Sequence, residues 1–230
     1  MDSFLDIKSV AKVFNENSPL EVKVLHHIDL SIKQGEFVVI SGPSGSGKTT
    51  LLNLIGGLDG VSEGEVSLAG VEITALDETQ LSDERKENIG FVFQAYNLIP
   101  VFTAKENIEY IMKLQGYTQQ QCDQRVDEVA DKLGIKEYLT KLPKELSGGQ
   151  QQRVAVARAV ASKPKLILAD EPTANLDSVH ALELMDMMEK LNEDENITII
   201  FSSHDPMVIQ KAKRSIVLKD GYVVKNEILS

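Results

Sequence analysis

The sequence predicts an α/β protein with a parallel-sheet core, an antiparallel β flank and a helix-rich insertion. Three short apolar runs carry the first part of this prediction: residues 36–40, 166–169 and 197–201. Each run is apolar at nearly every position and ends in polar or glycine residues, which is typical of parallel strands buried on both faces. A helical segment, Lys48 to Ile55, follows the first run after a glycine-rich loop. Strands that feed helices in this way indicate an α/β core.

The antiparallel flank is predicted from segments of a different character. Residues 4–10, 22–28, 64–69 and 89–93 indicate strands with hairpin-like punctuation. Residues 215–224 indicate a hairpin, because the Asp-Gly pair inside this segment readily takes the positive φ that a tight turn needs. We therefore expect a second, antiparallel β region beside the core.

Two helices are predicted by apolar residues spaced three or four apart. Their apolar faces comprise Val126, Val129, Ala130 and Leu133 in the first helix, and Ala181, Leu184, Met185, Met188 and Leu191 in the second. We interpret the methionines as core filler and the acidic run 193–195 as a solvated helix end. The chain is interpreted as one domain, 1–230, with the core and β subdomain in about 1–94 and 161–230 and a helical subdomain in about 95–160.

Charge argues against nucleic acid as a partner. The chain has 24 lysines and arginines against 35 aspartates and glutamates, a formal net charge of −11. No basic run gathers the cations into a patch, so we expect no nucleic-acid partner. The proportions of apolar (42%) and charged (26%) residues are those of a globular protein and exclude a disordered or collagen-like chain.

Compartment is predicted from three features. The single cysteine, Cys122, cannot form an internal disulfide, fits a reducing compartment and is interpreted as a surface thiol because its neighbours are polar. No window approaches the roughly 18 consecutive apolar residues of a membrane helix. The first residues, 1–6, are acidic where a signal peptide would be basic. We therefore expect a cytoplasmic protein, which leaves a membrane partner open.

Residues 42–49 fit the phosphate-loop pattern G-x-x-x-x-G-K-[ST]. Glycines let backbone N–H groups turn toward phosphates, and the helix that follows points its positive end at them. Lys48 is predicted to reach the β and γ phosphates of a nucleotide, and the Thr49 hydroxyl to hold Mg²⁺. The candidate nucleotide-binding residues here are Gly42, Ser44, Gly45, Ser46, Gly47, Lys48, Thr49 and Thr50.

Asp170 and Glu171 directly follow the apolar run 166–169. An aspartate at such a strand end can hold a magnesium ion, and a neighbouring glutamate can orient or deprotonate an attacking water. A solvated acidic turn would give the same dipeptide, but the phosphate loop favours the functional interpretation.

Residues 146–150, Leu-Ser-Gly-Gly-Gln, form the most specific motif. Ser147 can cap the helix that follows, and two glycines leave backbone N–H groups accessible to an anion. A second phosphate-reading helix start in a chain with one nucleotide loop indicates that two copies share each nucleotide.

Together these motifs resemble the ATP-binding subunits of ABC transporters. The ordered set spans almost the whole chain: the phosphate loop, Gln94, the signature 146–150, the acidic strand end, Asp177 and His204. The resemblance implies a P-loop NTPase (RecA-like) core with an antiparallel β subdomain and a helical subdomain. It also implies ATP and Mg²⁺ as cofactors.

The resemblance implies a role for each matching position. Phe14 stands where the family has an aromatic residue that stacks on adenine, and Gln94 where it has a glutamine that touches the magnesium or the attacking water. His204 would bind the γ-phosphate, and Asp177 would organise the dimer contact. Glu171, His204, Gln94 and Lys48 would be catalytic, and Thr49, Gln94 and Asp170 would hold the metal. Contacts to the ATP of the other protomer would come from Ser147, Gly148, Gly149 and Gln150.

The mechanism that follows is a clamp, in which two identical subunits close on two ATP molecules and hydrolysis loosens them. We expect an integral membrane permease as the second partner, which would keep the protein peripheral on the cytoplasmic face of the inner membrane. An apolar cluster after Gln94 is predicted to help form the groove for a cytoplasmic helix of that permease. It comprises Tyr96, Leu98, Ile99, Val101 and Phe102.

Segments 52–59, 90–100 and 168–173 resemble the branch that contains lipoprotein-releasing, macrolide-export and cell-division ATPases. Export or extrusion is therefore the expected function, with a regulator of cell-wall hydrolases or an amino-acid importer ATPase as alternatives. Mild departures are Tyr96 for phenylalanine, Ala174 for glycine and Ser203 for threonine. A chromosome-maintenance ATPase is excluded because only 98 residues, without sustained heptads, separate Lys48 from Ser147. A translation factor of this superfamily is excluded because it would need two cassettes in one chain.

Overall fold

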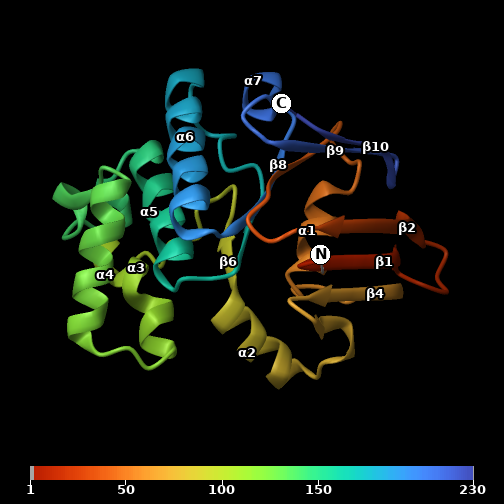
Figure 1. Ribbon diagram of the computed structural model, residues 1–230, viewed down its shortest axis with the longest axis horizontal. Helices are drawn as coiled ribbons and strands as arrows, with labels where there is room; N and C mark the ends of the chain where they lie inside the picture. Colours follow the sequence, from red (N-terminus) through yellow and green to blue (C-terminus); the bar gives the residue numbers. More distant parts are fainter. Residues whose placement is uncertain (1–2, 230) are drawn as a thin grey trace.

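The computed structural model describes residues 3–229, which form two sheets and a group of helices (Figure 1). The larger sheet has the strand order β10-β9-β3-β8-β7-β6, and the strands from β9 to β6 run parallel to their neighbours. Its strands are β3 (Phe37–Ser41), β6 (Ile89–Val92), β7 (Leu166–Ala169), β8 (Thr198–Ser203), β9 (Arg214–Lys219) and β10 (Tyr222–Ile228). The three apolar runs of the sequence are thus the adjacent central strands β3, β8 and β7, as predicted.

Two segments expected in the antiparallel flank belong to the larger sheet. The run 89–93 is its edge strand β6, paired in parallel with β7, and the 215–224 hairpin is β9 and β10. The hairpin prediction holds, since β9 and β10 pair antiparallel around Asp220 and Gly221. The error was to group these strands with the flank, because local sequence predicts a strand but does not say which sheet it joins.

The smaller, antiparallel sheet has the order β2-β1-β4-β5. It comprises β1 (Leu5–Phe14), β2 (Val22–Ile32), β4 (Glu63–Leu68) and β5 (Val71–Glu72), followed by the short helix η1 (Ile73–Ala75). In Figure 1 this sheet forms one arm of the molecule, opposite the arm that α3 and α4 form. The antiparallel β subdomain of the prediction is confirmed.

Helices cover both faces of the larger sheet. They are α1 (Lys48–Ile55), α2 (Glu78–Asn88), α3 (Ala104–Leu114), α4 (Gln119–Lys132), α5 (Gly148–Ala161), α6 (Ser178–Glu195) and α7 (Pro206–Ile209), with the 3₁₀ turns η2 (Lys136–Tyr138) and η3 (Pro143–Glu145). The sequence analysis did not predict α2, which buries no side chain and so carries no apolar face. It begins at a capping box in which Asp77 and Gln80 each bond the other's backbone N–H.

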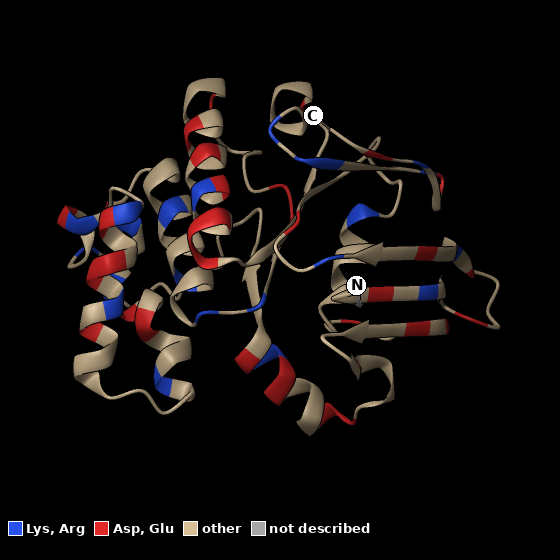
Figure 2. Ribbon diagram, in the orientation of Figure 1, with Lys and Arg blue, Asp and Glu red and all other residues tan. Residues whose placement is uncertain are grey.

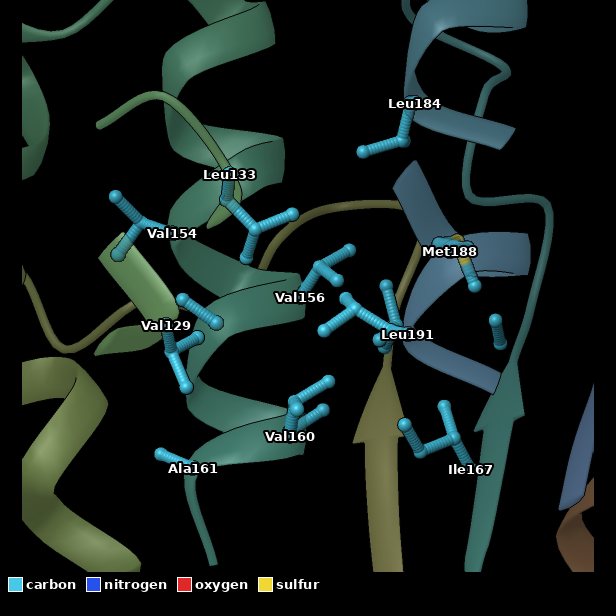
Figure 3. Close-up of a cluster of buried hydrophobic side chains, with 14 of the residues drawn as sticks. Val129, Leu133, Val154, Val156, Val160, Ala161, Ile167, Leu184, Met188 and Leu191 are labelled. Atoms are coloured by element: carbon cyan, nitrogen blue, oxygen red, sulfur yellow. The ribbon is translucent and has the colours of Figure 1, made fainter. Parts of the chain in front are cut away.

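The two faces of the larger sheet pack into two cores, and β3 shows how one strand serves both. Val38 and Ile40 lie in the core under the antiparallel sheet and α1, while Phe37 and Val39 face the core made with the helical part. Figure 3 shows side chains of the second core, where α5 and α6 meet. Met185 and Met188 of α6 are fully buried in that core, as predicted.

Cys122 is wrongly predicted to be a surface thiol. It is fully buried on α4, four residues before Val126 and seven before Val129, in the same apolar core. The helix begins earlier than the apolar pattern indicated, at a capping box of Thr118 and Gln121. The polar neighbours of Cys122 therefore lie on the opposite face of the helix.

The acidic run at the end of α6 is only partly solvated. Glu193 and Asp194 are exposed, but the Glu195 carboxylate is 15% exposed and forms an ion pair with Arg125 of α4 at 2.5 Å. Arg125 also donates to the carbonyl oxygens of Val160 and Ala161 at the end of α5. A fully satisfied guanidinium thus joins α4, α5 and α6. No helix within residues 3–229 is both long and apolar enough to cross a membrane.

Candidate nucleotide-binding site

The glycine-rich loop between β3 and α1 has the conformation that its glycines permit. Gly42, Gly45 and Gly47 have φ values of 147°, 78° and 101°. At Gly42 a Cβ would come within 2.0 Å of the Leu218 carbonyl oxygen, so only glycine fits there. Within residues 3–229 no side chain caps the N-terminus of α1, so its first N–H groups are open to an anion.

Lys48 lies across the mouth of this loop. Its side chain is 8% exposed, and its Nζ donates to the carbonyl oxygens of Gly42 at 2.9 Å and Pro43 at 3.1 Å. Its Nζ is also 3.9 Å from a carboxylate oxygen of Glu171. The buried Ser46 Oγ inside the loop has no hydrogen-bond partner within residues 3–229. A phosphate group would satisfy such an orphaned donor and the free N–H groups together.

The acidic strand end lies against the loop. The Thr49 hydroxyl donates to Asp170 Oδ2 at 2.8 Å, which places two hard oxygen donors side by side. Glu171 has a left-handed backbone conformation, with φ 46°, and its carboxylate contacts His204 Nδ1 at 2.8 Å. The donor set of Thr49 and Asp170 is one that suits Mg²⁺.

One cavity of about 680 Å³ collects these groups. It is lined by Val24, Pro43, Ser44, Gly45, Gly47, Lys48, Thr49, Thr50, Gln94, Glu171 and His204. The lining therefore comes from five segments that are far apart in the sequence. Each of the four residues interpreted as catalytic contributes to it.

The signature residues lie elsewhere. Ser147 caps α5 and forms a capping box with Gln150. A separate pocket of about 430 Å³, which we call the signature pocket, is lined by Gly134, Tyr138, Ser147, Gly148, Gly149, Gln150, Arg153, Asn175, Leu176, Asp177 and His180. It shares no lining residue with the phosphate-loop cavity, so one chain does not bring its own signature to its own loop.

Asp177 caps α6. Its carboxylate accepts from the backbone N–H groups of Val179 and His180, each at 3.1 Å, and contacts His180 Nδ1 at 2.6 Å. The backbone hydrogen bond from His180 and its side-chain contact lower the pKa of Asp177 below its usual value. Asp177 thus remains a carboxylate at the edge of the signature pocket.

Phe14 is not among the residues that line the phosphate-loop cavity. Its ring is 38% exposed at the end of β1, with the Lys12 ammonium 4.8 Å from the ring centroid. Val24 of the neighbouring strand β2 lines the cavity instead. Adenine stacking by Phe14 therefore stays a prediction.

A third depression, of about 420 Å³, lies between α2, β6, α3 and the end of α5. Its apolar lining includes Phe91, Phe93, Ile99, Tyr110, Ile111 and Leu114. Of the cluster predicted to form a groove, only Ile99 lines this one. Leu98 packs against the core, Phe102 against Tyr110, and Val101 is 77% exposed. We call this depression the α2–α3 groove.

Sequence reasoning missed three residues outside the motifs: two that contact the site, Asn175 and Ser202, and Arg158, which holds the loop after Gln94. Asn175 donates to the Gln94 carbonyl oxygen at 2.9 Å. Arg158 of α5 donates to the carbonyl oxygens of Tyr96 and Asn97, whose φ values are 60° and 48°. Ser202 bonds both Asp170 and the backbone of Glu171. For Ser202 the available signal was a hydroxyl directly after the apolar run 197–201.

Comparison of the sequence with known proteins points to the same family. The family model for ABC transporters matches residues 25–174. An uncharacterised ABC transporter ATP-binding protein of Methanocaldococcus jannaschii, MJ0796, is 43% identical over 229 residues, 98% of this chain and 97% of that protein. The bacitracin export ATP-binding protein BceA of Halalkalibacterium halodurans is 43% identical over 201 residues, 87% of this chain and 79% of BceA.

Solved structures give the same result. A dimeric structure of the MJ0796 cassette in a post-hydrolysis state, bound to ADP and Pi, superposes with a TM-score of 0.91 at 41% identity and covers 98% of this chain and 99% of that one. The macrolide export ATP-binding/permease protein MacB of Rhodopirellula baltica is 40% identical over 208 residues, but this chain spans 30% of its length. The chain belongs to the ABC transporter family, as an ATP-binding subunit and an ATPase.

Proposed function

We propose that the phosphate-loop cavity binds ATP with Mg²⁺ and that Glu171 is the general base for hydrolysis. The observation that carries this proposal is the meeting of Lys48, Gln94, Glu171 and His204 around one cavity. When bound, Mg²⁺ would neutralise charge on the phosphate oxygens. Thr49, Asp170 and Gln94 are the residues that would hold it.

The residues around the cavity have different proposed roles in ATP binding and hydrolysis. Lys48 exchanges its contacts to two carbonyl oxygens for phosphate oxygens, which a flexible ammonium does readily. Glu171 takes a proton from the attacking water, and its contact with His204 holds the carboxylate in place until His204 meets the γ-phosphate. The Lys48 ammonium lies 3.9 Å from the same carboxylate.

We propose further that two copies close face to face, so that the signature pocket of each completes the cavity of the other. The separation of the two pockets within one chain supports this arrangement. The dimeric structure of the MJ0796 cassette, which is similar over nearly its whole length, supports it as well. An isologous contact of this kind closes with two copies and goes no further.

The α2–α3 groove is proposed to receive a helix of the membrane permease. Its apolar lining fits the apolar face of an amphipathic helix. Its charged lining residues, Arg85, Lys86 and Arg158, are all cationic, although the chain as a whole carries −11. Figure 2 shows the basic turn of α2 set between acidic turns on the same helix.

Arg158 indicates the charge of that partner helix. The other arginines, at 85, 125, 153 and 214, each form an ion pair with a carboxylate, whereas Arg158 forms none within residues 3–229. Burial lowers the pKa of its guanidinium, and within residues 3–229 it donates to backbone carbonyl oxygens only. A carboxylate on the incoming helix would supply the missing counter-charge. The partner helix is therefore amphipathic and acidic.

The transport function proposed is export or extrusion, from the cytoplasmic face of the inner membrane. The relatives named for bacitracin and macrolide export support this direction. The test is recovery of partners by tagged Glu171→Gln from detergent-solubilised membranes with ATP, followed by mass spectrometry. A permease with a large extracytoplasmic domain is expected. A permease recovered with a soluble binding protein would contradict export, and a soluble partner alone would contradict the transport function.

A further inference from the structure

Ser202 lies beneath the acidic strand end and belongs to none of the motifs. It is in β8, the strand between β3 and β7, and its side chain is completely buried. Three of the six residues of β8 are aliphatic or aromatic and three carry a hydroxyl group, and every position of the strand is buried. A hydroxyl in such a strand needs a partner, because burying one without a hydrogen bond is costly.

The hydroxyl of Ser202 has two partners, and both are in the acidic strand end. The backbone N–H of Glu171 donates to Ser202 Oγ at 2.8 Å. Ser202 Oγ donates to Asp170 Oδ1 at 2.7 Å. A hydroxyl has a single hydrogen, so the N–H donor fixes the direction: the hydrogen of Ser202 points to Asp170.

The other carboxylate oxygen of Asp170 is also occupied. The Thr49 hydroxyl donates to Oδ2 at 2.8 Å, so hydroxyl groups from α1 and β8 hold the two oxygens of Asp170. The plane of the carboxylate is thereby fixed, with Oδ2 turned toward the phosphate loop. Glu171, next in the chain, has φ 46°, a sparsely populated conformation for a residue with a side chain, and its N–H is held by the same serine.

We propose that Ser202 is a positioning residue, which orients the Asp170 carboxylate for Mg²⁺ and holds the backbone of Glu171 beside it. This inference rests on the magnesium site proposed above. Residues that hydrogen-bond to metal ligands typically change metal affinity about 10–100-fold when they are removed. Ser202 does not line the cavity, so it acts through Asp170 and Glu171 and touches no nucleotide.

The test is calorimetric binding of ADP, once with excess Mg²⁺ and once with EDTA. The ratio of the two dissociation constants is the metal-dependent gain, and it is measured without turnover. Ser202→Ala is expected to reduce this gain about tenfold and to leave binding in EDTA unchanged. The matched control is Ser203→Ala, the next residue along β8, which is also buried but whose hydroxyl, within residues 3–229, accepts only from the Asp205 N–H. It is expected to keep the wild-type gain.

A pair of isosteric variants separates the hydroxyl from the volume of the side chain. Ser202→Thr keeps the hydroxyl and Ser202→Val replaces it by a methyl group, so Thr should retain the gain and Val should lose it. If either fails to fold, as judged by thermal unfolding, the alanine pair decides. Wild-type gain in Ser202→Ala, or equal losses with Mg²⁺ and with EDTA, would overturn the role of Ser202. Absence of any gain in the wild-type protein would overturn the magnesium site itself.

Discussion

The phosphate-loop cavity and the α2–α3 groove differ in how far one chain completes them. In the cavity, Asp170, Glu171 and Lys48 already have partners from other segments of the same chain. In the groove, Arg158 has backbone carbonyl oxygens but no carboxylate within the described residues. The contrast teaches that the groups proposed for hydrolysis are preorganised within one subunit, whereas the groove proposed for the permease helix lacks one counter-charge that a partner would supply.

The largest effect is expected from breaking the cavity. Glu171→Gln removes the proposed general base, and steady-state ATP hydrolysis should fall by about 10²–10⁴-fold. ATP binding should persist, because the loop and Lys48 are untouched, and the ATP-bound protein should elute as a dimer in size-exclusion chromatography. Hydrolysis at the wild-type rate would remove Glu171 from this role.

Arg125 is the buried arginine to compare with Arg158, because a carboxylate, Glu195, already pairs with it. Arg125→Met leaves Glu195 without its nearest cation in a site that is mostly buried. The free energy of unfolding should fall by about 3 kcal/mol, the range for breaking one partner of a buried pair. Urea denaturation measures this change. A loss below about 1 kcal/mol would mean that the pair behaves like a surface ion pair.

The ion pair between Arg125 and Glu195 also predicts that the free energy of unfolding depends on pH. Burial alone would raise the pKa of Glu195, but the hydrogen bonds and charges of Arg125 and Lys132 outweigh it and hold the pKa below its usual value. A carboxyl group with a depressed pKa stabilises the fold above its unfolded pKa of about 4.3, and this contribution is lost as the pH falls through the folded pKa. Glu195→Gln should therefore be less stable than wild type at pH 7, with a difference that shrinks toward pH 3. A constant difference in urea denaturation would contradict this.

The smallest effect is expected at the groove. Arg158→Gln removes the charge that lacks a carboxylate, and affinity for the permease should fall about tenfold, with a weaker dependence on salt. Hydrolysis by the isolated subunit should change by less than about threefold, since Arg158 does not line the cavity. The control is Arg214→Gln, which removes an arginine of β9 that does not line the groove and is already paired with Glu36. Equal losses of affinity in both variants would contradict an acidic partner helix.

Much of the fold could be predicted from the sequence because periodicity reports burial directly. The central strands β3, β7 and β8, helix α1 and the apolar face of α6 are all visible as local patterns. Helix α2 was missed because it buries no side chain, and Cys122 was misplaced because the start of α4 was not recognised. The sheet to which β6 and the β9–β10 hairpin belong was also wrong, since pairing partners are set by long-range contacts.

The sequence by itself determined the residues of the phosphate loop and the acidic strand end, on which the proposed chemistry depends. Phosphate binding demands particular residues at fixed spacing, and such spacing is written along the chain. Only the tertiary structure decided what lies between motifs: the hydroxyl of Ser202 beneath Asp170, the carbonyl oxygens around Arg158, and the separation of the signature pocket from the cavity. Those relations join residues far apart in the sequence, and the packing of strands and helices around two cores sets them.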